Sequence, residues 1–399
     1  RCGCRYMPKI FNGLELCSGP GGLSEGFMSA KYKDSKFFIA VANDSDENVS
    51  RTYTNNHKNT KFVLGSLVSE KIKKNIENAI KDTVETSNID IVIGGPPCQG
   101  FSHANKKTRT ILNPLNRLAL DFFEMVRRVK PFSFVLENVP GILSMQNGDV
   151  MNQIIQNFQS LGYHNTEYWI LNATDYGVPQ KRKRVFVVGS KSPKKIIPPK
   201  PTHGQTQLER HTTVWDVLSD LPTICSGHKI SSSMKYRHTA KNSLQKKLRN
   251  RSNIVKNHIV TVNNDLVIER FKCVPQGGNW QDIPKKKMTR NGQYKNMNCT
   301  HSGIYRRLSA NEPSVTITNF RKSMLIHPIQ DRLLSVREAA RLQTFPDTFE
   351  FHGTLSSMQQ QVSDAVPVNL AKAVAKALLQ HMEQSLCHTN NQKLKWKSS

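Results

Sequence analysis

Strand-like and helix-like segments alternate through the first half of the chain, and this alternation most constrains its fold. Short apolar runs rich in β-branched residues are followed by polar segments whose apolar residues recur at helical spacing. The expected strands cover residues 9–16, 36–44, 89–95, 131–139 and 183–190, and the expected helices cover 23–30, 69–84, 118–129 and 151–162. This order is typical of parallel β-α-β units, so we expect an α/β fold with a doubly wound sheet. Ligands of such sheets bind at the carboxyl ends of the strands.

The pattern changes between about residue 190 and residue 305, where prolines, polar residues and basic runs dominate. A disordered linker is one interpretation, but the apolar residues Phe271, Val274 and Trp280 favour a small folded domain. Strand-like and helical patterns return after Ile304. We therefore expect a large domain at 1–190, a smaller basic domain at 191–305, and a return to the large domain at 306–399.

Positive charge dominates the composition. The 399 residues include 57 lysines and arginines against 30 aspartates and glutamates, a formal net charge of +27. This excess favours nucleic acid as partner over a membrane, because no amphipathic basic helix stands out. No apolar run approaches the ~20 residues of a membrane helix. A solvated basic surface is the alternative. The first residues lack the apolar stretch of a signal peptide, so we expect a cytoplasmic protein.

The eight cysteines are scattered along the chain, without a CxxC pair and without histidines at zinc spacing. We therefore expect no metal. Disulfides are not expected in a reducing compartment, which leaves thiols available as thiolates.

A glycine-rich turn follows the first expected strand, in the segment ELCSGPGGLSEGF. Its glycines allow close backbone approach, and the amides of the following helix suit a cofactor that carries a carboxylate or phosphate. Asp44 ends the next strand, where nucleotide-binding sheets place an acid on the ribose hydroxyls. The pair favours a nucleoside cofactor, although the spacing is not the dinucleotide fingerprint, and a plain structural turn is the alternative.

A double-proline elbow presents Cys98 at the end of the apolar strand 89–95. Because prolines cannot continue a strand and Gly100 follows, the thiol is expected at the mouth of the cofactor cleft, although a packed core cysteine is the alternative. Glu137 ends a neighbouring apolar strand, and desolvation there should raise its pKa to suit a proton donor. A helix cap or a surface acid is the alternative for Glu137. Arg182 and Arg184, two residues apart, are expected on one face of a strand entrance, or are ordinary edge charges.

Together these motifs resemble the cytosine-C5 DNA methyltransferases over nearly the whole chain. The matching segments are ELCSGPGG, GGPPCQGFS, ENVPG, QKRKR, RRLSANEPSVTIT, LSVREAARLQTFPDTF and QVSDAVPVNLAKAVAKAL. GGPPCQGFS with ENV and QxRxR in this order is highly specific. The resemblance implies a Rossmann-like, S-adenosylmethionine-dependent domain at 1–190 and a loop-rich target-recognition domain at 191–305. Residues 306–399 would return to the large domain with a C-terminal helix and a frayed tail.

The resemblance also implies the chemistry of the site. Cys98 would add to C6 of a flipped-out cytosine, Glu137 would assist at N3, and Arg182 and Arg184 would hold the base carbonyl and nearby phosphate or acidic groups. The implied cofactor-binding residues are Leu16, Cys17, Ser18, Gly19, Gly21, Gly22, Leu23, Asp44, Ser45, Ser66, Leu67, Pro97, Asp364 and Ala365. The implied substrate-binding residues are Gln99, Ser102 and Asn138.

Four positions depart from the family pattern. An aromatic residue is common where Cys17 stands, a bulky residue where Ser45 stands, and an aspartate that contacts the adenine amino group where Ser66 stands. Gly-Asn is usual in place of Ser363-Asp364. Each change is expected to weaken cofactor binding, and none touches Cys98.

Three functions compete. The favoured one is a bacterial DNA cytosine-C5 methyltransferase of a restriction-modification system, a monomer acting on double-stranded DNA with a cognate endonuclease that cuts the same site. The second is a tRNA methyltransferase on the same scaffold; its extra cysteine motif is not seen, and the basic stretch 190–305 argues for DNA. The third, a non-enzymatic DNA-binding relative, is disfavoured by the intact Cys98 and Glu137.

Overall fold

The computed structural model describes residues 9–85, 88–96, 117–204, 209–228, 233–289 and 303–395. The chain divides into two compact units, of which the first contains residues 1–172, 183–200 and 368–399 and the second contains 173–182 and 201–367. No helix of the described residues is both long enough and apolar enough to cross a bilayer.

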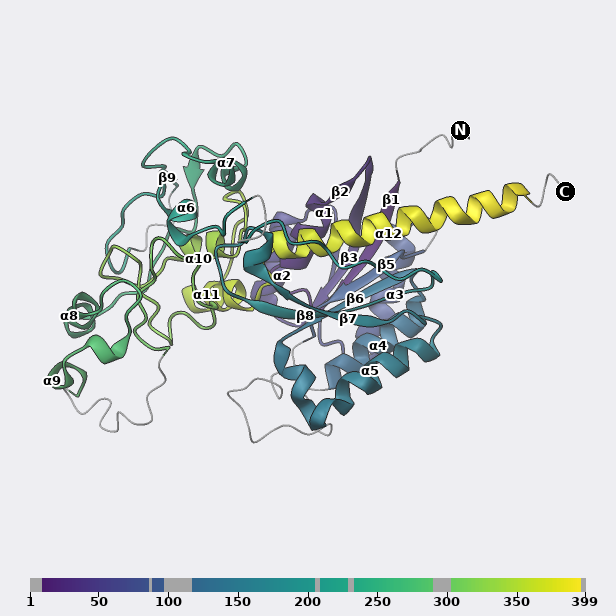
Figure 1. Ribbon diagram of the computed structural model, residues 1–399, viewed down its shortest axis with the longest axis horizontal. Helices are drawn as coiled ribbons and strands as arrows, with labels where there is room; N and C mark the ends of the chain where they lie inside the picture. Colours follow the sequence, from purple (N-terminus) through teal and green to yellow (C-terminus); the bar gives the residue numbers. More distant parts are fainter. Residues whose placement is uncertain are drawn as a thin grey trace. The chain divides into compact units, whose positions relative to one another are not determined.

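The first unit is built on one mixed sheet, in the order β2-β3-β1-β5-β6-β8-β7, with β4 paired to β3 (Figure 1). Its strands are β1 (Ile10–Leu16), β2 (Lys31–Tyr32), β3 (Ser35–Asp44), β4 (Lys61–Leu64), β5 (Ile91–Gly94), β6 (Ser133–Asn138), β7 (Glu167–Asn172) and β8 (Lys183–Ser190). The central strands β4, β3, β1, β5 and β6 are parallel, as the alternating pattern predicts. Strand β8 is antiparallel to both β6 and β7. The α/β fold class is therefore confirmed, with an antiparallel edge that the pattern did not predict.

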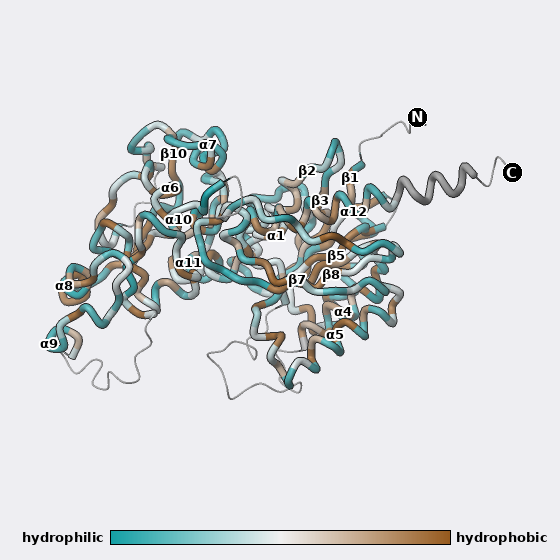
Figure 2. Tube along the Cα trace, viewed as in Figure 1, coloured by the Kyte–Doolittle hydropathy of each residue, from teal (hydrophilic) through white to brown (hydrophobic). Residues whose placement is uncertain are grey.

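Helices cover both faces of this sheet. They are α1 (Gly22–Ser29), α2 (Glu47–Asn56), α3 (Glu70–Thr83), α4 (Arg117–Val129), α5 (Asp149–Ser160) and α12 (Val368–Lys395), with 3₁₀ turns at Pro140–Gly148. Side chains of α3, α4 and α5 share one apolar core with β1, β5, β6 and β8, while α1 packs against α12 and β3. Figure 2 shows apolar residues concentrated along the central strands. Gly26 permits the close contact of α1 with α12, because a Cβ there would lie 2.4 Å from that of Ala371.

The second unit has mostly irregular backbone with short elements. They are 3₁₀ turns at Ala173–Tyr176 and Trp280–Asp282, helices α6 (Val214–Leu218), α7 (Ser243–Arg249), α8 (Asp265–Cys273), α9 (Lys285–Met288), α10 (Val336–Leu342) and α11 (Leu355–Asp364), and the two-stranded pair β9 (Met234–Lys235) and β10 (Ile254–Val255). Phe271 and Val274 are fully buried in its core and Trp280 packs against them. The described part of 201–289 is therefore folded and is not a linker.

The boundaries of the units differ from those expected from the sequence. Residues 306–367 cluster with the second unit, and the chain returns to the first unit only at Val368. The physical reason is shared burial, because Ile326 and Leu333 lie in the same core as Phe271. A buried ion pair adds to it: Arg341 of α10 binds Asp220 at 2.5 Å, and both side chains are inaccessible to solvent.

Candidate active site

The carboxyl ends of β5 and β6 meet beside the segment that leads to Cys98. The two strands are parallel, with Gly94 opposite Leu136, and the Asn138 side-chain amide donates to the Pro96 carbonyl at 3.4 Å. A Cβ on Gly95 would lie 3.0 Å from Oε2 of Glu137, so the glycine lets the backbone pass directly over that carboxylate. Cys98 itself, with Pro97, Gln99 and Ser102, lies outside the described residues.

Glu137 and Arg184 form an ion pair across the antiparallel strands β6 and β8. Nε of Arg184 lies 2.8 Å from Oε1 of Glu137, and each side chain is only 11% exposed. The register explains the pairing, because Glu137 lies opposite Phe186 and Asn138 opposite Val185 at the end of β6. The two neighbouring strands thus bring together a carboxylate and a guanidinium that the sequence placed 47 positions apart.

Arg182 has a different environment from the one expected. It lies before β8 and belongs to the second unit, while Arg184 belongs to the first. Its guanidinium is buried and donates to the carbonyls of Ile317, Ser363 and Ala365 at 2.8–3.1 Å. These contacts indicate that Arg182 fastens segments of the second unit to one another.

The glycine-rich turn leaves open space above its backbone. Cys17 and Gly19 have positive φ values of 51° and 53°, and Gly21 caps α1 with φ 101°. A Cβ at Gly19 would meet no atom within 4 Å, whereas one at Gly21 would lie 2.7 Å from the His57 ring. Ser18 is held by a hydrogen bond from its amide to the Asn43 carbonyl at 3.0 Å. The turn is therefore packed tightly underneath and open at Gly19.

Asp44 is fastened to this turn. One carboxylate oxygen accepts from the Gly19 amide at 2.9 Å, and the other accepts from the amides of Ser45 and Asp46. Burial raises the pKa of Asp44, and these backbone hydrogen bonds oppose the increase. The strand-end acid predicted from the sequence thus lies directly beside the glycine turn.

The end of β4 lies next to Asp44, because Asp44 pairs with Leu64 in the parallel register. Ser66 is exposed there, Leu67 is buried, and Leu64 is 45% exposed despite its apolar side chain. Ser45 is also exposed. An exposed apolar side chain next to Asp44 and Ser66 provides a surface on which a planar group can pack, and sequence reasoning missed it.

The other predicted cofactor residues fall into three groups. The side chains of Leu16 and Leu23 are buried in the core, so only their backbone could touch a ligand. Gly22 is the first residue of α1. Asp364 and Ala365 lie at the end of α11 in the second unit, where Asp364 accepts from Gln360 and the Ala365 carbonyl accepts from Arg182.

A buried acid beneath the turn was also missed. Glu15 accepts from Ser24 and from the Tyr53 hydroxyl, the latter at 3.1 Å, while Oε1 has no hydrogen-bond partner among the described residues. Burial raises the pKa of Glu15 to about 8, although both hydrogen bonds lower it. The signal in the sequence was an acid in an apolar strand, two residues before the turn.

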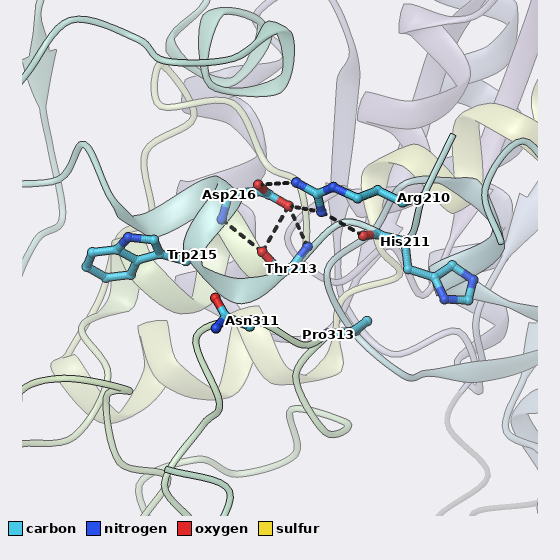
Figure 3. A pocket seen from close by; sticks show the side chains of 7 residues that line it. All are labelled: Arg210, His211, Thr213, Trp215, Asp216, Asn311 and Pro313. Carbon is cyan, nitrogen blue, oxygen red and sulfur yellow. Dashed lines mark hydrogen bonds and ion pairs between the residues drawn. The ribbon is translucent and has the colours of Figure 1, made fainter. Parts of the chain in front are cut away.

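The described residues contain no candidate metal cluster, and a pocket in the second unit involves none of the predicted site residues. Among the described residues, no group of three or more histidine, cysteine or acidic side chains could hold a metal ion. A pocket of about 410 Å³ in the second unit is lined by Arg210, His211, Thr213, Trp215, Asp216, Asn311 and Pro313 (Figure 3), none of which was predicted as a site residue. Asp216 neutralises Arg210 with two hydrogen bonds of 2.8 and 2.9 Å, so the pocket does not offer a free guanidinium to an anion.

Comparisons with known proteins show the family of the chain. A family model for C-5 cytosine-specific DNA methylases matches residues 11–380. The Type II methyltransferase M.DdeI of Desulfomicrobium norvegicum is 32% identical over 405 residues, covering 96% of this chain and 92% of that protein. M1.HphI of Haemophilus parahaemolyticus is 32% identical over 370 residues, covering 92% of this chain and 86% of that protein. A solved putative DNA modification methyltransferase from an E. coli prophage has a TM-score of 0.71 and 25% identity, covering 93% of this chain and 99% of that chain. The chain therefore belongs to the family of C-5 cytosine-specific DNA methylases.

Proposed function

We propose that this DNA (cytosine-5)-methyltransferase attacks its target base with Cys98 and takes the methyl group from S-adenosylmethionine. The Cys98 thiolate forms a bond to C6 of cytosine and makes C5 an enamine carbon that is nucleophilic enough to accept a methyl group. C5 then loses its proton, the bond from sulfur to C6 breaks, and the aromatic ring is restored. The observation that carries the proposal is the Glu137 carboxylate, which faces Gly95 on the segment leading to Cys98.

Glu137 would assist the addition by donating a hydrogen bond or a proton to N3 of the base. Arg184 would hold this carboxylate in place through its 2.8 Å ion pair, and its guanidinium would also contact the base carbonyl. Both residues lie on strands, which position a catalytic group more rigidly than loops do. Asn138, tied to Pro96, would maintain the spacing between the acid and the nucleophile.

The residues around the glycine turn fit S-adenosylmethionine, which supplies the methyl group when bound. Gly19 offers open space, Asp44 offers acceptor oxygens for hydroxyl groups, and Leu64 and Ser66 offer an apolar and a polar contact beside it. Serine at position 66 supplies a hydroxyl where a carboxylate is usual, so the adenine contact would be weaker than in most of the family.

The described part of 201–289 would read the DNA target. Extruding a cytosine costs a few kcal/mol of unstacking, and phosphate contacts from lysines would offset this cost. A role as the modification half of a restriction-modification system implies a cognate endonuclease that cuts the same site when unmethylated. We also propose that the enzyme works as a monomer in the bacterial cytoplasm.

A duplex carrying 5-fluorocytosine at the target tests the nucleophile. Fluorine cannot leave C5 as a proton does, so the wild-type enzyme should form a covalent adduct that survives denaturation. Cys98→Ser should form none while binding DNA with unchanged affinity, because an alcohol is a far weaker nucleophile than a thiolate. An adduct that persists in Cys98→Ser would refute the assignment. Transfer of labelled methyl groups to tRNA but not to DNA would refute the assignment of DNA as the substrate.

A further inference from the structure

Four lysines lie near the ends of strands β6 and β8 that are opposite the proposed active site. Lys130 follows α4 just before β6 begins, and Lys191, Lys194 and Lys195 follow the end of β8; all four are exposed. The Lys191 ammonium donates to the Lys130 carbonyl at 2.7 Å, which brings the two segments together. We call these four residues the amino-edge lysine cluster.

The loop that carries three of these lysines is fixed by hydrogen bonds. The Asn165 side chain donates to the carbonyls of Ser192 and Pro193 at 3.0 and 2.8 Å. Ser385 donates to the Ser192 hydroxyl at 2.9 Å. Ser190, Ser192 and Ile196 are buried, whereas the lysines between them point outward. A loop fixed by these hydrogen bonds holds its lysines at defined positions. Lysines that only interact with solvent would not need such fixed positions.

The lysines also crowd positive charge. Partial desolvation of its ammonium, followed by the neighbouring charge of Lys130, lowers the pKa of Lys191. Burial also lowers the pKa of His381 on α12, and Lys194 contributes to that decrease. Crowding like charges is unfavourable unless an anion offsets it. The arrangement is therefore suited to a polyanion.

The cluster cannot serve the DNA that is being methylated. Glu137 and Arg184 lie at one end of the β6–β8 pair, and Lys130 and Lys191 lie at the other. Lys191 lies seven positions after Arg184, which corresponds to about 23 Å along an extended strand. A DNA duplex is stiff over roughly 150 base pairs, so the stretch that delivers the cytosine would not curve around to the opposite edge without a large bending cost.

We propose that the amino-edge lysine cluster binds the phosphates of a second DNA duplex while the first is held at the catalytic edge. The partner is DNA because DNA is the polyanion on which this family acts, and lysines bind phosphates without regard to sequence. The enzyme then passes directly from one DNA segment to another. The inference does not depend on the Cys98 mechanism.

Competitor-driven dissociation tests the proposal. In direct transfer, release of a labelled duplex accelerates as the concentration of unlabelled competitor duplex increases. Wild-type enzyme should show this acceleration, and the triple variant K130Q/K194Q/K195Q should lose most of it, by roughly tenfold. Loss of up to three phosphate contacts should also lower the salt slope for second-duplex binding by about two to three.

Single-turnover methylation of one short duplex should be unchanged, since the three side chains lie away from Glu137. Lys191 is left in place because its ammonium also ties two segments together.

A matched variant controls for total charge. K61Q/K71Q/K74Q removes the same number of exposed lysines from β4 and α3 in the same unit, and it should behave as wild type. The proposal fails if wild-type release is independent of competitor, if the triple variant keeps the acceleration, or if both triple variants lose it equally. It also fails if single-stranded RNA, but not duplex DNA, produces the acceleration.

Discussion

Arg184 donates through Nε to Oε1 of Glu137 at 2.8 Å, and the two strands that carry these residues are hydrogen-bonded neighbours. The pair is nearly buried, so solvent screens it less than it would a surface ion pair. Removing one partner from such a pair leaves the other charge uncompensated. In the proposed mechanism, Arg184 would therefore act on the reaction through the position and charge of Glu137 as well as through the base.

Arg184→Gln should therefore reduce the rate of methyl transfer by about 10²-fold, because a misplaced acid loses most of the ~10²–10⁴-fold that general acid help provides. Arg184→Lys keeps the charge but loses the planar fork, so it should recover only part of the rate. The measurement is single-turnover methylation with saturating cofactor. Lys183→Gln, an exposed neighbour on the same strand, serves as the control and should match wild type. Equal rates for Arg184→Gln and wild type would contradict the positioning role.

Glu137→Gln should slow methylation by about 10²–10⁴-fold while leaving cofactor binding unchanged. Glutamine retains a hydrogen bond but cannot supply a proton to N3. The expected signature is a loss in kcat with an unchanged dissociation constant for S-adenosylmethionine. A variant within threefold of the wild-type rate would show that the carboxylate does not act as the acid.

The Glu137–Arg184 ion pair illustrates what the sequence could predict. Glu137 and Arg184 each end or begin a strand, and strand ends are where ligands bind in doubly wound sheets, so both were identifiable. Their direct contact was not predictable, because it requires β8 to run antiparallel beside β6, and the apolar pattern of 183–190 does not specify direction. Arg182 shows the same limit, since nothing local indicates that three carbonyls of the second unit surround its guanidinium.

The second unit was predicted less well for a physical reason. Its core packs Phe271 against Ile326 and Leu333, which follow it by more than 50 positions in the sequence. A core built from such distant segments produces no local apolar periodicity. Helix α10 carries Arg337, Glu338 and Arg341, which a sequence pattern would place on the surface. All three are buried because Asp220, Asp347 and Arg332 compensate their charges, and only the fold brings these partners together.

The glycine turn offers a paired test of packing against binding. Gly21→Ala forces a Cβ to within 2.7 Å of the His57 ring at φ 101°, so it should lower the free energy of unfolding by about 1–3 kcal/mol. Gly19→Ala meets no neighbour, so it should cost only the ~1–2 kcal/mol of a left-handed alanine. Its methyl group would instead occupy the space proposed for the cofactor. Urea unfolding and cofactor titration should therefore separate the two variants, with Gly19→Ala losing more affinity than its lost stability explains. If Gly19→Ala bound the cofactor with unaltered affinity, the proposed binding site at Gly19 would be wrong.

Glu15→Gln should change how stability depends on pH. Burial raises the pKa of Glu15 from about 4.5 to about 8, so the folded state keeps a proton that the unfolded chain releases between these values. The stability that this proton contributes is fully present below pH 4.5 and is lost as the pH rises towards 8. Glutamine can still bond to Ser24 and Tyr53 but does not titrate, so the variant should lose less free energy of unfolding than wild type between pH 5 and pH 8.

Urea unfolding at both pH values measures the difference. Glu47→Gln, which removes an exposed carboxylate paired with Arg51, should retain the wild-type pH dependence. If Glu15→Gln retained it as well, Glu15 would have to be ionised in the folded enzyme at neutral pH.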